Sequence, residues 1–195
     1  MTEHSSDTAP DHSADGSPAD SVARDLGTWM AQIPAEPTGR PAATEAARQR
    51  IGRLSRLFGR VLDEVADGHG LSVGDLEALS ALQRTPGPCT PTTLAHLLGV
   101  TSGTISTRLR RLEAAGLVEA ADEAVDRDGR SRPVRLTSAG RGRWSAATVD
   151  RLDIERERFA VLDDDDLARL NDALGLLLAE YERRYGAASR HDRTG

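Results

Sequence analysis

Apolar residues recur every three to four positions along most of the chain, which is the spacing of helices with one buried face. Strands are indicated only near residues 117–136, where two short apolar runs flank an Arg-rich loop. The pattern therefore predicts a mainly α-helical fold with a small β-hairpin.

The chain begins with a polar segment and a short helical stripe. Residues 1–19 are rich in Asp, Ser and Pro and poor in apolar side chains, so we expect a disordered acidic tail. A helix is predicted over about 20–31, where one face carries Val22, Leu26, Trp29 and Met30. Prolines and a glycine over 34–41 then predict a stiff, non-helical linker that ends at Pro41. Residues 20–41 thus form an N-terminal helix and linker.

Two long apolar stripes lie near opposite ends of the chain. The first predicts a helix over 44–67 and consists of Ile51, Leu54, Phe58, Val61, Leu62 and Val65. The second predicted region spans 139–184, and its last helix carries Leu167, Leu170, Leu174, Leu177, Leu178 and Tyr181. Four acidic residues at 163–166 open that helix and complement the positive end of its dipole. The stripes must bury against each other or against a second subunit, so we expect dimerisation helices and a homodimer.

The central segment has the spacing of a helix-turn-helix over 90–115. Thr90 stands at an N-cap with Pro91 in the first turn, where a missing N–H is tolerated. Gly99 suits the left-handed residue of a tight turn, and Thr101 caps a second helix over 102–115.

The second helix of this pair has an apolar side and a side suited to a DNA groove. On a helical wheel, Ile105, Leu109 and Leu112 share one narrow sector that must pack on the domain. The opposite side carries small polar residues first and Arg last, so the backbone can approach base edges while Arg reaches phosphates or guanine. An ordinary solvated face has a similar pattern, so the interpretation depends on the hairpin that follows.

The hairpin, predicted over 117–137, completes the pattern of a winged helix-turn-helix. Leu117 and Val118 begin one strand, residues 133–136 form the return strand, and the loop between them is rich in Arg. Such a tip suits a minor groove or phosphates, and the aspartates beside the Arg residues indicate some internal ion pairs. The predicted DNA-binding residues are Ser102, Gly103, Thr104, Ser106, Thr107, Arg108, Arg110, Arg111, Arg127, Arg130 and Arg132.

Charge is distributed unevenly. Residues 1–45 contain eight acidic and two basic side chains and so account for the formal net charge of −6. Residues 99–145 hold nine Arg against six acidic residues, which favours double-stranded DNA as a partner. A two-fold dimer would match a palindromic operator. The acidic start lacks the regions of a secretory signal and no apolar run suits a bilayer, so we expect a cytoplasmic protein without a membrane partner.

The sequence offers few residues suited to catalysis, metal binding or redox chemistry. Cys89 is the only cysteine, which excludes an intrachain disulfide and a Cys-rich zinc site. The sequence has no nucleophile elbow, phosphate loop or His–carboxylate metal spacing, so we expect no cofactor, no metal and no enzymatic activity. Because Cys89 precedes a helix N-terminus, a redox-switched repressor is one alternative. A winged helix that only binds proteins is the other, although it would not need outward Thr104, Thr107 and Arg110.

In order and spacing, these segments resemble the MarR family of winged helix-turn-helix transcription regulators. The resemblance covers about Thr44–Arg184, and its most specific stretches are LAHLLGV at 94–100, RLRRLEAAGLV at 108–118, DGRS at 128–131 and RLTSAGR at 135–141. It implies a domain over 44–186, followed by a disordered tail over 187–195. It further implies a homodimeric repressor that releases its operator when a small molecule, often an aromatic acid, binds.

The extra N-terminal helix is similar to that of the subgroup containing the urate-responsive and PecS regulators. This resemblance implies ligand-binding roles for Trp29, Glu77 and Arg108, the last of which helps to transmit ligand binding. Trp29 alternatively serves only as an apolar anchor for its helix. Glu77 replaces an Asp of the subgroup and Ala120 replaces an Arg, which removes a cation suited to an anionic purine. The expected effector is therefore purine-like or phenolic, with urate itself left open.

Overall fold

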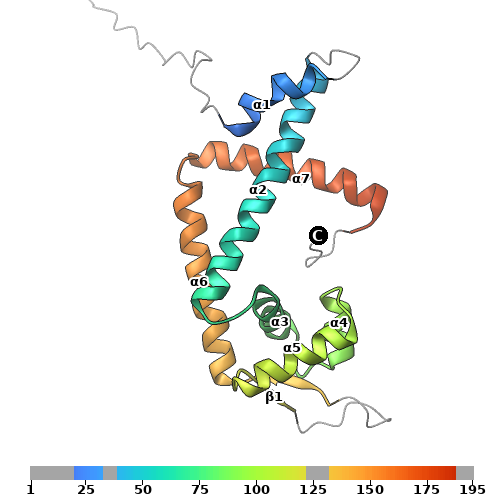
Figure 1. Cartoon of the computed structure of the whole chain (residues 1–195), viewed down its shortest axis with the longest axis vertical. Coiled ribbons are helices and arrows are strands. Elements are labelled where there is room, and N and C mark those ends of the chain that lie inside the picture. The colour runs from blue at the N-terminus through green and yellow to red at the C-terminus, as the bar shows by residue number, and fades with distance from the viewer. Residues whose placement is uncertain (1–19, 33–38, 122–131, 188–195) are drawn as a thin grey trace, which may run out of the picture. The chain divides into compact units, whose positions relative to one another are not determined.

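A computed structural model of the chain describes residues 20–32, 39–121 and 132–187 (Figure 1). The chain divides into two compact units, residues 1–57 and 58–195, and the division falls inside helix α2 (Arg40–Gly68). The predicted tails lie outside the described residues, apart from Ala187.

The first unit contains α1 (Ser21–Met30) and the N-terminal part of α2. Asp20 caps α1 and also forms an ion pair with Arg50 of α2 at 2.7 Å. A second ion pair joins Asp25 and Arg53 at 3.0 Å. These contacts hold α1 on the N-terminal part of α2.

Helix α2 begins earlier than the linker prediction allowed. Pro41 stands in the first turn of α2 and not in a non-helical linker, so the prediction is wrong at this residue. Proline is tolerated there because the first amides of a helix have no intrahelical acceptor. The other predicted linker residues fall mostly in 33–38, outside the described part of the chain.

Three short helices form the centre of the second unit: α3 (Val73–Arg84), α4 (Pro91–Leu97) and α5 (Ser102–Ala114). Each follows a residue whose hydroxyl accepts a hydrogen bond from the amide three positions on; these caps are Ser72, Thr90 and Thr101. Gly99, between α4 and α5, has φ +62°, a conformation that favours glycine. The predicted helix-turn-helix is confirmed in its caps and its turn.

The predicted hairpin is present. Strands β1 (Val118–Ala120) and β2 (Val134–Leu136) pair antiparallel, with Val118 opposite Leu136. Cys89 extends this pairing, because its amide and carbonyl each form a 2.9 Å hydrogen bond with Val134. The sequence did not predict this contact, since a single paired residue leaves no periodic pattern.

The core of the second unit lies between the helix-turn-helix, α3 and the hairpin. Its most buried large side chains, each at most 1% exposed, are Leu79, Leu94, Ile105 and Leu112. Helix α6 (Ser138–Phe159) contacts α3 and β2 and then leads away from this core, and α7 (Asp164–Tyr185) follows at its far end (Figure 1). No residue of α7 is buried.

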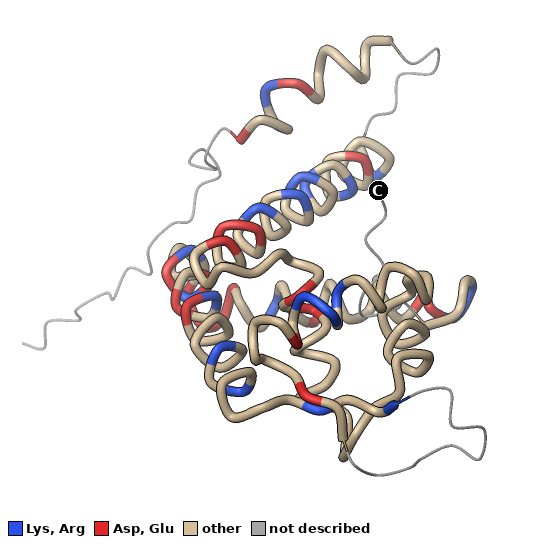
Figure 2. Tube along the Cα trace, turned by 60° about the horizontal axis from the view of Figure 1, so that its bottom comes forward, with Lys and Arg blue, Asp and Glu red and all other residues tan. Residues whose placement is uncertain are grey.

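Acidic and basic positions are interspersed along the described helices (Figure 2). Asp163 caps α7 and three further aspartates occupy its first turn, as the dipole argument predicted. Among the described residues, no helix is both long and apolar enough to cross a bilayer. The same residues contain no cluster of three or more His, Cys, Asp or Glu able to hold a metal.

Candidate nucleic-acid interface

Helix α5 has the two faces that its sequence predicts. Ile105 is 0% exposed, Leu109 4% and Leu112 1%, so these residues fix the helix on the core. The exposed residues on its other sides include Gly103, Thr104, Thr107 and Arg110. A rigid helix with a small, polar outer surface is suited to insertion into a major groove.

The hydroxyl groups of α5 differ in the hydrogen bonds that they form with nearby residues of the chain. Ser106 Oγ donates to the carbonyl of Ser102 at 2.7 Å, and the Thr104 hydroxyl lies 2.9 Å from that of Thr101. Arg110 Nη2 donates to Thr107 Oγ1 at 3.3 Å. Among the described residues, Arg110 is thus held by this one weak contact along the helix, and its side chain lies on the exposed side.

Arg111 has a specific partner on α3. Its Nη2 donates to Asp75 Oδ1 at 2.5 Å and to Ser72 Oγ at 3.1 Å. Asp75 is 3% exposed and is the one buried charged residue among those described. Burial raises the pKa of Asp75, but hydrogen bonds from Arg111 and Ser72 outweigh that effect and hold the pKa below its ordinary value. The outward position of Arg111 was predicted, whereas Asp75 was missed because no local pattern marks a contact across 36 residues.

Arg108 also lies against α3. Its guanidinium is 3.9 Å from Glu77 Oε2, and the side chains are 13% and 18% exposed. A β-carbon at Gly74 would overlap this guanidinium, so the absence of a side chain at Gly74 makes room for it. Arg108 Nη1 is buried and has no hydrogen-bond partner within the described residues. The structure brings Glu77 and Arg108 together, and their role in ligand binding stays a prediction.

Two hollows flank α5. A groove of about 890 Å³ runs between α5 and the hairpin, with Ser106, Arg110 and Arg132 on its walls. A smaller hollow of about 390 Å³ lies on the other side of α5 and is lined by Gly103, Thr104, Thr107, Arg108 and Arg111. Nine of the predicted DNA-binding residues therefore line one of these hollows: Ser102, Gly103, Thr104, Ser106, Thr107, Arg108, Arg110, Arg111 and, from the hairpin, Arg132.

The hairpin is described up to its strands. Arg132 is exposed next to β2, whereas Arg127 and Arg130 lie outside the described residues and stay predictions from the sequence. Across the strands, Arg135 Nε donates to Glu119 Oε1 at 2.8 Å. Ala120, where the subgroup has an Arg, is exposed on β1 and brings no charge to this surface.

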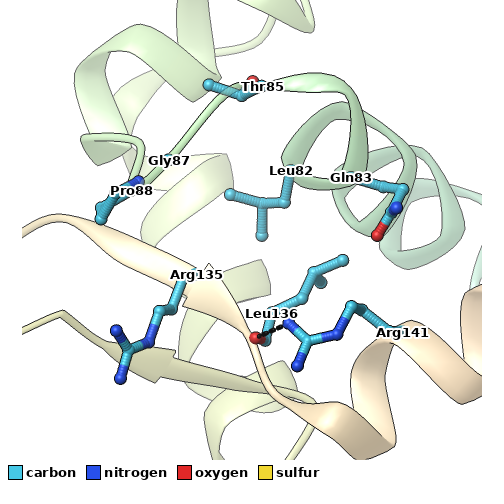
Figure 3. Close-up of a pocket in the computed structure, with 8 residues that line it drawn as sticks. All are labelled: Leu82, Gln83, Thr85, Gly87, Pro88, Arg135, Leu136 and Arg141. Carbon is cyan, nitrogen blue, oxygen red and sulfur yellow. Dashed lines mark hydrogen bonds between the residues drawn. The ribbon is translucent and has the colours of Figure 1, made fainter.

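A further cleft lies between the C-terminal end of α3 and β2 (Figure 3). Its polar groups are mostly engaged with the protein itself: Arg141 Nη1 donates to the Leu136 carbonyl at 2.9 Å, and Thr85 Oγ1 donates to the Ala81 carbonyl at 2.9 Å. Arg135, which also borders it, pairs with Glu119. Since these groups are already bonded, the cleft does not define a binding site.

The environment of Cys89 does not favour a redox switch. The residue is 2% exposed, and burial raises the pKa of its thiol. A reactive cysteine needs access and a stabilised thiolate, and this one has neither. The helix N-terminus that follows Cys89 does not compensate for its burial.

Trp29 belongs to the first unit, and 41% of its surface is exposed. Glu77 and Arg108 belong to the second unit. The ligand-binding role of Trp29 therefore stays a prediction.

The second unit thus contains a winged helix-turn-helix, a class of DNA-binding domain. Residues 69–131 match the model of the MarR family. The transcriptional regulator PecS of Dickeya dadantii is 27% identical over 127 residues, which cover 64% of this chain and 75% of PecS.

Solved structures of transcription regulators have the same fold as the second unit. The apo form of MarR from E. coli is 25% identical, with a TM-score of 0.56, over 65% of this chain and 95% of that chain. A point mutant of MepR from S. aureus, bound to an oligodeoxyribonucleotide, is 20% identical with a TM-score of 0.54, over 69% and 97%. In sequence over residues 69–131 and in fold, the second unit is thus similar to the MarR family of DNA-binding transcriptional regulators.

Proposed function

We propose that the protein is a homodimeric repressor that binds a palindromic operator and releases it when a small aromatic or purine-like anion binds. The observation that carries the proposal is α5, which is anchored by three buried apolar residues and presents small polar residues and Arg outward. In the proposed complex α5 enters a major groove and the hairpin lies beside it. The likeness in fold to a MepR mutant that was solved bound to an oligodeoxyribonucleotide supports DNA binding by this chain.

In the proposed complex, the short side chains and the Arg residues of this surface would make different contacts with DNA. Gly103, Thr104 and Thr107 have short side chains that let the backbone approach the bases, and Arg110 is long enough to reach guanine or a phosphate. Arg132, exposed beside the hairpin, is suited to a backbone phosphate. Ser106 contributes less to base contacts, since its hydroxyl donates within the helix.

The homodimer is supported by the surface of α7. Large apolar residues on this helix are 38–57% exposed and recur at helical spacing: Leu170, Leu174, Leu177, Leu178 and Tyr181. A contiguous apolar stripe of this length is unusual on a monomer and is typical of an interface. A second copy of the chain would cover it and would place two α5 helices on one duplex.

The effector proposal is supported by the buried guanidinium of Arg108. A donor without a hydrogen-bond partner costs free energy in the folded protein, and an anion would satisfy it. Glu77, 3.9 Å away, would bind a donor group on the same ligand, such as a ring N–H or a phenol.

The DNA-binding part of the proposal is tested by selecting duplexes of about 30 base pairs from a random library with the wild-type protein. We expect a palindromic sequence to be enriched. Arg110→Ala should then weaken binding to that duplex by about 1–3 kcal/mol. Arg156→Ala on α6 removes the same charge from an exposed residue outside the interface and should leave the affinity nearly unchanged. Selection that enriches no sequence would instead favour a protein-interaction module.

The effector part is tested by a thermal-shift screen with urate, other purines and phenolic acids. A true effector should raise the melting temperature of the wild type, should not raise that of Arg108→Ala, and should release the selected duplex. If a compound stabilises both proteins equally, Arg108 is not its binding residue.

A further inference from the structure

The ion pair between Asp75 and Arg111 joins the first turn of α3 to α5, the helix proposed to enter the major groove. Asp75 Oδ2 accepts hydrogen bonds from the amide of Ser72 at 3.0 Å and from its hydroxyl at 2.8 Å, while Oδ1 accepts from Arg111. The same carboxylate therefore closes the capping box of α3 and holds a side chain of α5. An acid used in this way cannot move without disturbing both helices.

The two side chains of the pair differ in their exposure to solvent, which leaves Arg111 accessible to a further ligand. The side chain of Asp75 is 4% exposed, whereas that of Arg111 is 55% exposed. Arg111 uses Nη2 for Asp75 and Ser72, and within the described residues Nε and Nη1 have no hydrogen-bond partner. These remaining donors belong to a guanidinium that borders the smaller hollow beside Thr104 and Thr107.

A fixed guanidinium at the edge of such a hollow suits a phosphate. Arg presents its donors in a rigid planar fork, and a fork held by one carboxylate loses less conformational entropy when it binds a second anion. The hydroxyl of Thr107 and the backbone near Gly103 lie in the same hollow and leave space for an anion. DNA supplies phosphates on both sides of a helix that enters its major groove.

We propose that Arg111 binds a DNA phosphate in this hollow and that Asp75 is the positioning residue that holds Arg111 there. The inference rests on the proposed operator binding. It assigns Arg111 to the phosphate backbone and not to a base, and it gives Asp75 a part in DNA affinity although Asp75 itself is buried.

The sign of the effect separates positioning from plain electrostatics. Removing a carboxylate near DNA reduces repulsion, so charge alone predicts tighter binding by Asp75→Asn. Positioning predicts weaker binding, because Arg111 is released from its productive geometry. Glu113→Gln removes an exposed carboxylate from α5 itself and provides the charge control, for which we expect equal or tighter binding.

The test measures affinity for the selected duplex, and for a scrambled duplex of equal length, over a range of salt concentrations. We expect Asp75→Asn to weaken binding about five- to tenfold. Arg111→Gln should weaken it at least as much and lower the slope of log K against log salt by about one. In the Arg111→Gln background, Asp75→Asn should cost little more, whereas a general folding defect would persist.

Several outcomes would overturn the inference. Binding by Asp75→Asn that is as tight as, or tighter than, that of Glu113→Gln would show that Asp75 does not position Arg111. An unchanged salt slope for Arg111→Gln would show that Arg111 contacts no phosphate, and this result stands even if Asp75→Asn fails to fold. A wild-type protein that selects no DNA would instead refute the proposed function, so the two failures are distinguishable.

Discussion

A buried carboxylate is costly unless its partners compensate for the lost hydration, and Asp75 shows how this is done. Its two oxygens accept hydrogen bonds from Ser72 and Arg111, and these partners keep it ionised despite its burial. Asp75 therefore contributes to stability mainly in its charged form. This dependence on charge can be measured.

The lowered pKa of Asp75 predicts a loss of stability in acid. A carboxyl group whose pKa is lower in the folded than in the unfolded protein stabilises the fold above its unfolded value and loses that contribution as the pH falls. The window therefore begins near pH 4 and extends below it. Urea unfolding at a series of pH values should show a smaller acid-induced loss for Asp75→Asn than for the wild type. Parallel curves for the two proteins would contradict the prediction.

Cys89 gives a second prediction at this scale. Because the thiol is buried and its pKa is raised, hydrogen peroxide should leave DNA binding by the native protein unchanged. A thiol reagent should react slowly with the native protein and rapidly after unfolding in urea. Peroxide-dependent release of the selected duplex, reversed by dithiothreitol, would restore the redox alternative.

Residues whose role follows from a local pattern could be predicted from the sequence, whereas residues whose role depends on a partner distant in the sequence could not. Ile105, Leu109 and Leu112 were predicted because burial follows the helical period. Asp75 and Gly74 were missed, since their importance comes from Arg111 and Arg108, which are distant in the sequence. Pairings of this kind depend on how α3 and α5 pack, and no local pattern encodes that packing.

At the scale of elements, the hairpin and α6 pack closely where they join. Thr137 caps α6, its amide donates to the Leu117 carbonyl at 3.1 Å, and its hydroxyl donates to the Gly116 carbonyl at 2.7 Å. Gly140, in the first turn of α6, lies so close to Leu117 that a β-carbon would overlap the carbonyl oxygen of Leu117.

This close approach predicts opposite effects for two glycines of one helix. Gly140→Ala should destabilise the protein by about 3 kcal/mol, because the overlapping atom belongs to the backbone and cannot rotate away. Gly142 has open space around its α-carbon, so Gly142→Ala should stabilise by up to about 1 kcal/mol through helix propensity. Urea unfolding of both variants measures the difference. Equal effects would show that α6 does not pack against Leu117 in this way.

The elements themselves were largely predictable because each carries a local signal. Hydroxyl caps at Thr90 and Thr101 and the turn at Gly99 gave the bounds of α4 and α5 to within about a residue or two. The start of α2 was misplaced, since proline is compatible both with a linker and with a first helical turn. The pairing of Cys89 with β2 has no such signal.

For the whole molecule, the described structure shows apolar surface that one chain leaves uncovered. Besides the stripe on α7, the first unit exposes Ile51, Leu54 and Leu57 of α2 at 40–49%. Within the second unit, Phe58 and Phe159 stack at 6.2 Å between ring centroids, yet Phe58 is still 41% exposed. Apolar area of this extent favours association, because burying it releases about 25 cal/mol for each Å² removed from water.

The proposed homodimer predicts that a charge on the α7 stripe will separate the subunits and weaken operator binding. Leu174→Glu places a carboxylate in the centre of the proposed interface, where burial without a partner is strongly unfavourable. Leu176→Glu is the matched control, since Leu176 is 77% exposed and lies two residues on, away from the stripe. Light scattering after size-exclusion chromatography should give a monomer for the first variant and a dimer for the second.

The same pair of variants links assembly to DNA binding. A dimer binds its second half-site as an intramolecular event, so the monomer should lose about 100-fold or more in affinity for the selected palindrome. Its affinity for a duplex with one half-site should change little, because α5 and the hairpin are intact. If Leu174→Glu stays dimeric, or if both variants bind the palindrome equally well, the α7 stripe is not the surface that brings two α5 helices onto one operator.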